Sequence, residues 1–188
     1  MESARPGITD EVNSIVLNLR FKNPDALHSF LDNARKNSDK TGWQYELDVL
    51  KEKLNTNSDI GFSVKDLNNK EIDILDYTAS TIIELKSYSS SSWITIAKNF
   101  GNDVGCQIGT IENSLKSQFS SLIGQVRIEI GGNDIWRNAT KMELIENLKS
   151  AILNPDWGAS LKLNMDNMTH LIIENATGKH VIERASWQ

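Results

Sequence analysis

Apolar residues recur every three to four positions in several segments of the chain, and this spacing predicts amphipathic helices. In the first third, the pattern predicts helices at residues 9–20, 23–36 and 42–54. The last of these places Leu47, Leu50 and Leu54 on one face. Two further segments, 110–123 and 139–154, show the same spacing, and the second ends before Pro155.

Other segments are short, rich in β-branched residues and bounded by turn residues, which is typical of β-strands. The pattern predicts three strands near 61–65, 71–75 and 81–85, a strand at 126–130, a strand at 161–165 and a terminal hairpin that turns at 175–179. Short connections make the first three strands an antiparallel meander, and the strand at 126–130 can return beside them by a crossover. The fold class we expect is therefore mixed α/β, or α+β.

Composition places the chain among ordinary globular proteins, with 188 residues, 39% of them hydrophobic. No apolar run approaches the roughly 20 residues of a membrane span, and the N-terminus lacks a signal-peptide pattern. Cys106 is the only cysteine and there are three histidines, so neither an internal disulfide nor a zinc site is expected. The net charge of −5 argues against a sequence-independent nucleic-acid coat, but it is compatible with an enzyme that uses a local basic groove and metal ions.

Charged residues interrupt the most β-prone part of the chain. Alternation along the strand at 81–85 and its continuation places Glu84 and Lys86 on one face. If the strand at 71–75 is its hairpin neighbour, Asp73 lies near Glu84. Two carboxylates that close repel each other unless a cation lies between them, and Mg²⁺ is the cation that prefers such oxygen ligands. Lys86 can then hold a phosphate oxygen, or orient or deprotonate the attacking water.

A third acid is positioned by helix geometry. At about 100° per residue, Glu46 lies on the flank of the helix at 42–54, between Leu50 and Val49. The other acids of this helix, Asp48 and Glu52, fall on its polar face. A carboxylate on a buried flank needs a partner, and the metal site is a candidate. Pairing with Lys53 in solvent is the alternative.

The segments "EIDILDYTASTIIELKS" and "GWQYELDVLKEKL" together resemble the PD-(D/E)xK nuclease superfamily, although no proline precedes Asp73. The resemblance implies a restriction-endonuclease-like core of helix, three-stranded meander, helix and strand over residues 41–131. An N-terminal helical segment (1–40) and a C-terminal extension with a β-hairpin (132–188) lie outside it. By the same resemblance, Asp73 and Glu84 are metal ligands, Lys86 is the catalytic lysine, Glu46 is an additional metal ligand, and Gln118 helps to position substrate.

The function implied is a Mg²⁺- or Mn²⁺-dependent endonuclease that hydrolyses phosphodiester bonds in DNA or RNA, including tRNA. Stand-alone domains of this kind look like the C-terminal toxin domains of bacterial contact-dependent and other polymorphic toxin systems. That similarity implies a cognate immunity protein, delivery as a secreted effector and action in the cytoplasm of a target cell. Without delivery, a cytoplasmic protein is expected.

Two alternatives remain open. Restriction or DNA-repair endonucleases share the same motif. A non-catalytic interaction domain would instead use Asp73, Glu84 and Lys86 as the solvated face of an antiparallel sheet that binds a basic partner. The nuclease hypothesis predicts that substitution of Glu84 or Lys86 abolishes cleavage and leaves the fold intact.

Overall fold

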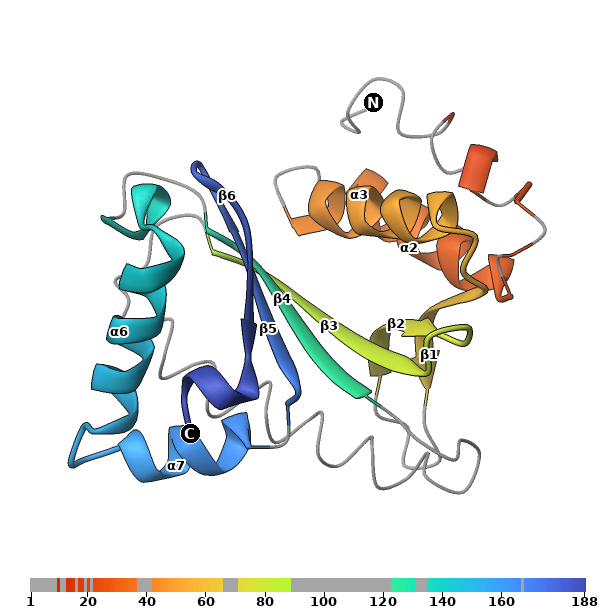
Figure 1. Ribbon diagram of the computed structural model, residues 1–188. Coiled ribbons are helices and arrows are strands. Elements are labelled where there is room, and N and C mark those ends of the chain that lie inside the picture. The colour runs from red at the N-terminus through yellow and green to blue at the C-terminus, as the bar shows by residue number, and fades with distance from the viewer. Residues whose placement is uncertain are drawn as a thin grey trace. The chain divides into compact units, whose positions relative to one another are not determined.

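The chain divides into two compact units, Met1–Thr81 and Ile82–Gln188. The structure, a computed structural model shown in Figure 1, describes residues 10, 13–15, 17–18, 20, 22–36, 42–65, 71–88, 123–130, 135–166 and 168–188. Each unit contains helices and strands, so the prediction of a mixed α/β protein is confirmed. The finer restriction-endonuclease-like arrangement and the predicted boundary near residue 40 stay predictions.

In the first unit, helices α2 (Pro24–Lys36) and α3 (Gly42–Asn55) pack against a β-hairpin. They precede its strands, β1 (Ile60–Lys65) and β2 (Glu71–Asp76). The strands pair antiparallel, with Phe62 opposite Ile74. Phe30 of α2 meets Phe62 edge to face, with ring centroids 5.2 Å apart. The helices therefore pack on the ladder face that carries Phe62 and its partner Ile74.

The outer edge of β1 is covered by the chain that precedes α2. Ile60 donates its N–H to the Arg20 carbonyl (3.0 Å), and Lys22 donates to the Ile60 carbonyl (2.8 Å). One step further, the side-chain amide of Asn23 bonds both backbone groups of Phe62. Asn23 stands directly before α2, and its described side-chain hydrogen bonds go to β1. Arg20, Lys22 and Asn23 thus satisfy backbone groups that an exposed edge strand would leave to solvent.

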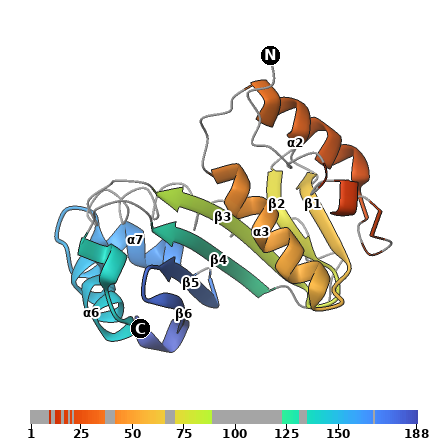
Figure 2. The ribbon, with the colours of Figure 1, turned by 90° about the horizontal axis from the view of Figure 1, so that it is seen from above.

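The second unit is built on a sheet in which β3 (Thr81–Tyr88), β4 (Ile123–Ile130), β5 (His170–Asn175) and β6 (Gly178–Glu183) lie in that order. Figure 2 shows β3 and β4 running in the same direction. Strands β4 and β5 are also parallel, whereas β5 and β6 form an antiparallel hairpin. A parallel neighbour requires a crossover connection of a dozen or more residues. Residues 89–122 supply that length between β3 and β4.

The crossover from β4 to β5 contains η2 (Ile135–Asn138), α6 (Lys141–Ile152) and α7 (Gly158–Met165). Both α-helices lie on one side of the strands, as Figures 1 and 2 show. Between helices and strands lies one apolar core, which consists of Val126, Ala139, Leu144, Leu148, Ala151, Leu161, Met165, Met168, Leu171, Ile173, Ile182 and Trp187. A capping box begins α6, because Thr140 and Glu143 bond each other's backbone N–H groups. This helix and the terminal hairpin agree with the sequence predictions.

One predicted strand is wrong. Residues 161–165 belong to α7, which runs from Gly158 to Met165. Leu161 and Met165 are both buried, at 1% and 0% exposure, whereas Leu163 between them is 70% exposed. Burial at positions i and i+4 follows the helical period, and alternation alone could not reveal it in so short a run. Gly158 fits the corner before the helix because a Cβ there would lie 2.1 Å from the Ile152 carbonyl oxygen.

Of the predicted helix at 110–123, residues 110–122 fall outside the described residues, whereas Ile123 is the first residue of β4, which therefore begins three residues before the predicted strand at 126–130. Of the predicted helix at 9–20, residue 10 and residues 13–15 are helical. None of the helices in the described part of the chain has the length and apolar character that crossing a lipid bilayer requires.

Candidate functional site

Strand β3 carries a buried carboxylate with a lysine beside it. Glu84 is 1% exposed, and its Oε1 lies 2.6 Å from Nζ of Lys86, whose side chain is 32% exposed. The contact agrees with the prediction that both side chains point to the same face of the strand. The burial of residues 81–85, in contrast, does not fit a solvated sheet face at Glu84. Taking a carboxylate out of water is costly, so Glu84 depends on partners such as Lys86.

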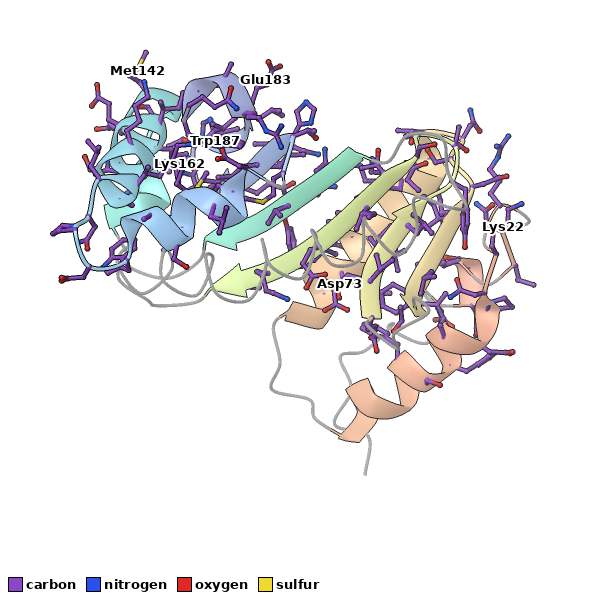
Figure 3. The ribbon with its side chains drawn as sticks, turned by 90° about the horizontal axis from the view of Figure 1, so that it is seen from below. Lys22, Asp73, Met142, Lys162, Glu183 and Trp187 are labelled. Atoms are coloured by element: carbon purple, nitrogen blue, oxygen red, sulfur yellow. The ribbon has the colours of Figure 1, made fainter. Side chains whose placement is uncertain are left out.

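Strand β2 carries Asp73, which is half-buried and labelled in Figure 3. The neighbouring acid Asp76 identifies the face of this strand that meets α3, because Lys53 Nζ lies 3.5 Å from its Oδ2. Successive residues of a strand point to opposite faces. Asp76 and Ile74 therefore face the helices, and Asp73 faces the other way.

The strand opposite Asp73 is distorted at one residue. The β1–β2 register pairs Phe62 with Ile74 and Val64 with Ile72, so Ser63 stands opposite Asp73. Ser63 has a φ of 51°, in the left-handed region that few non-glycine residues adopt. Its hydroxyl donates to the carboxylate of Glu71, on the same face as Asp73. The local strain thus lies at the ladder position of a predicted metal ligand.

Helix α3 carries Glu46, which is half-buried, between the buried residues Val49 and Leu50 that the helical wheel predicted as its neighbours. The alternative partner proposed for Glu46, Lys53, instead pairs with Asp76. Helix α3, which carries Glu46, packs on one face of the β1–β2 ladder. The Asp73 side chain points away from the opposite face, so the ladder lies between the helix and this side chain. A shared metal for these two acids stays a prediction without support from this geometry.

Asp76 is a buried acid that the sequence analysis missed. It is 1% exposed at the end of β2, and its Oδ1 accepts the backbone N–H of Ala79 at 2.8 Å. This bond shapes the turn into β3 in the manner of an Asx turn. An aspartate directly before a polar four-residue turn was the available signal. With Lys53 on its other oxygen, Asp76 has a structural role.

A second buried ion pair lies on the sheet of unit 2. Arg127 on β4 is 1% exposed, and its guanidinium contacts Glu174 on β5. Lys179 on β6 approaches the same carboxylate at 3.7 Å. The motif of alternating polar residues in "QVRIEI" gave no reason to single out this arginine.

Two predictions about the site are not tested by the described residues of either unit. Gln118 lies outside the described residues. Asp73 belongs to unit 1 and Glu84 to unit 2, and their convergence stays a prediction. Within each unit taken alone, the described residues bring together no group of three or more His, Cys, Asp or Glu side chains.

The donor types present are nevertheless those that Mg²⁺ prefers. Glu84 and Asp73 offer carboxylate oxygens on strand positions, and a hard divalent ion bound by one or two carboxylates keeps its remaining sites for water and phosphate. Lys86 supplies a positive point charge next to one of those acids. Of these three residues, the structure brings Glu84 and Lys86 together within one unit.

Comparison with known proteins gives no family assignment. No protein-family model, curated protein or solved structure matches the chain.

Proposed function

We propose that this chain is a metal-dependent phosphodiester hydrolase of the PD-(D/E)xK type that acts on DNA or RNA. The observation that carries the proposal is the contact of 2.6 Å between Lys86 Nζ and the buried Glu84 carboxylate. An acid and a lysine two positions apart on one buried strand are the arrangement that this chemistry needs. The parallel course of β3 and β4 supports the proposal, because the helix–strand crossover of that superfamily requires it.

In the proposed reaction, the oxygen of a water molecule bonds to phosphorus, the bond from phosphorus to a sugar oxygen breaks, and that oxygen takes up a proton. A bound Mg²⁺ would lower the pKa of the water and offset the negative charge that develops on the phosphate. Glu84 and Asp73 are its proposed ligands. Lys86 orients the water or the phosphate oxygen through its point charge.

Delivery as an antibacterial toxin with a cognate immunity protein is a further part of this proposal. It rests on the sequence resemblance alone, and co-purification with an inhibitory protein encoded beside it would test it. The cleavage chemistry does not depend on it.

The direct test is incubation of the purified chain with supercoiled plasmid and with total tRNA, with Mg²⁺ or with a chelator. We expect metal-dependent cleavage of one substrate class and its loss in Glu84→Gln, which keeps the shape of the side chain. Glu146→Gln makes the same change at an exposed position of α6 and should retain activity. Absence of cleavage by the wild type, or full cleavage by a folded Glu84→Gln variant, would overturn the proposal.

A further inference from the structure

Strand β6 ends the strand order of unit 2, and among the described residues no strand pairs with its outer edge. Arg184 donates its N–H to the Thr169 carbonyl at 3.1 Å, which continues the β5–β6 ladder one step beyond Glu183. Backbone groups of successive residues in a strand point to alternate edges. Those of Lys179, Val181 and Glu183 therefore point away from β5.

The outer edge of β1, in contrast, is covered. Hydrogen bonds from the backbone of Arg20 and Lys22 and from the Asn23 side chain cover the outer edge of β1. Natural proteins cover, shorten or charge such edges, because an uncovered edge pairs with other chains. Among the described residues, neither a strand nor a covering segment lies against the outer edge of β6, and addition of a strand is a mode of association that such an edge supports.

The charged side chains of β6 are complementary to those of a second β6 that pairs with it antiparallel. Lys179, Val181 and Glu183 share one face of β6, and all three are exposed. In antiparallel pairing of two copies centred on Val181, Lys179 lies opposite the partner's Glu183, and Val181 lies opposite the partner's Val181. Other centres lose this match: pairing centred on His180, for example, places Lys179 opposite the partner's Val181. Opposite charges directly across a ladder stabilise it, and like charges destabilise it.

We propose that β6 pairs antiparallel with β6 of a second copy of this chain, in the register that joins Lys179 to the partner's Glu183. The backbone groups that point away from β5 then form the hydrogen bonds of the new ladder, and the sheet of unit 2 continues through a twofold axis into the second copy. Lys179 keeps its approach to Glu174 at 3.7 Å, since its ammonium has three donors. The proposal is independent of the hydrolase function.

Charge reversal tests the register. Sedimentation equilibrium over a concentration series should show a reversible dimer for the wild type. Lys179→Glu and Glu183→Lys each create two like-charge contacts per dimer, so each should weaken dimerisation by roughly tenfold or more. In the double variant Lys179→Glu/Glu183→Lys, glutamate at 179 lies opposite the partner's lysine at 183, so both contacts again join opposite charges. This variant should dimerise as the wild type does.

Mixing the two single variants gives the sharpest comparison. At a concentration where the wild type is largely dimeric, each single variant alone should be mostly monomeric. The mixture should form a heterodimer, because every reversed residue then lies opposite a residue of the other charge. Both variants retain a negative net charge, so general attraction between them is excluded. Glu146→Lys on α6 is the matched control and should leave the dimer intact, and circular dichroism verifies that each variant is folded. A monomeric wild type, or a dimer that both single reversals leave unchanged, would overturn the proposal.

Discussion

Nζ of Lys86 lies 2.6 Å from Oε1 of Glu84, and only 1% of Glu84 is exposed. From the sequence alone, loss of either residue is predicted to leave the fold intact. Burial changes that expectation, because a carboxylate that loses a charged partner inside a protein destabilises the folded state. The pair therefore contributes to stability as well as to the proposed chemistry, and experiments must separate the two.

We predict that Lys86→Ala lowers the free energy of unfolding by about 1–3 kcal/mol, since it removes a charged hydrogen bond to a buried acid. The estimate stays below that for a fully buried pair because Lys86 is about one third exposed. Urea unfolding followed by circular dichroism measures the change.

Lys86→Arg separates stability from catalysis. Arginine keeps the positive charge, so most of the stability should remain. Its planar, delocalised guanidinium does not reproduce the compact ammonium, so cleavage should fall at least tenfold. Full activity in Lys86→Arg would show that Lys86 serves only as a structural cation.

The Lys53–Asp76 pair gives a second prediction, confined to unit 1. Lys53→Met leaves the buried Asp76 charge without this partner and should cost about 1–3 kcal/mol of stability. The double variant Lys53→Met/Asp76→Asn should be less destabilised than the sum of the single variants, because the charge is then absent. A double-mutant cycle by chemical denaturation measures the coupling, and strict additivity would argue against a direct interaction.

Ser63 provides a third prediction, which concerns the backbone opposite Asp73. Its φ of 51° penalises a β-branched side chain, so Ser63→Val should lose about 1–2 kcal/mol of stability. Ser63→Gly suits this conformation and should be close to the wild type in stability. Thermal unfolding of both variants checks the order, and a Ser63→Val protein as stable as Ser63→Gly would contradict the left-handed geometry.

Much of the local structure could be predicted because short-range signals agree. Strand β2 and the four-residue turn after it follow from β-branched residues and turn chemistry, and α6 follows from its apolar period. The strand predicted at residues 161–165 is wrong, because the apolar spacing in a run of five residues fits both the strand period of two and the helix period of 3.6. The buried positions Leu161 and Met165 show which period holds.

The site was predicted only in part, since burial and sheet faces depend on long-range contacts. Alternation correctly joined Glu84 to Lys86 because they belong to one strand. It could not show that Glu84 is buried, or that α3 packs on the ladder face opposite Asp73. The left-handed backbone of Ser63 and the charge pairing of Arg127 also arise from neighbouring strands, so no local pattern reports them.

The capping box of α6 gives a prediction of pH dependence. Hydrogen bonds from the backbone and side chain of Thr140 lower the pKa of Glu143 below its usual 4.5. A lowered folded pKa means that the ionised carboxylate stabilises the fold above the unfolded pKa, and that this contribution is lost as pH falls through the folded pKa. The stability advantage of the wild type over Glu143→Gln should therefore be largest near neutral pH and should shrink below pH 4.5.

Thr140→Ala is the companion variant and removes the acceptor of the cap, at a cost of about 1 kcal/mol. The difference in the free energy of unfolding between Thr140→Ala and the wild type should become smaller as the pH falls below 4.5. Urea unfolding at pH 7 and at several values below 4.5 measures both variants. A difference that is constant with pH would show that Glu143 does not interact as an ion.

The proposed function requires that Asp73 and Glu84 hold one divalent metal beside Lys86. Electron paramagnetic resonance of Mn²⁺ titrated into the wild type, Asp73→Asn and Glu84→Gln tests it most directly, since free and bound Mn²⁺ differ in signal. We expect a saturable Mn²⁺ site in the wild type, at least tenfold weaker Mn²⁺ binding in each variant, and unchanged binding in Glu146→Gln. A wild type without a saturable site, or variants that bind Mn²⁺ as the wild type does, would contradict it.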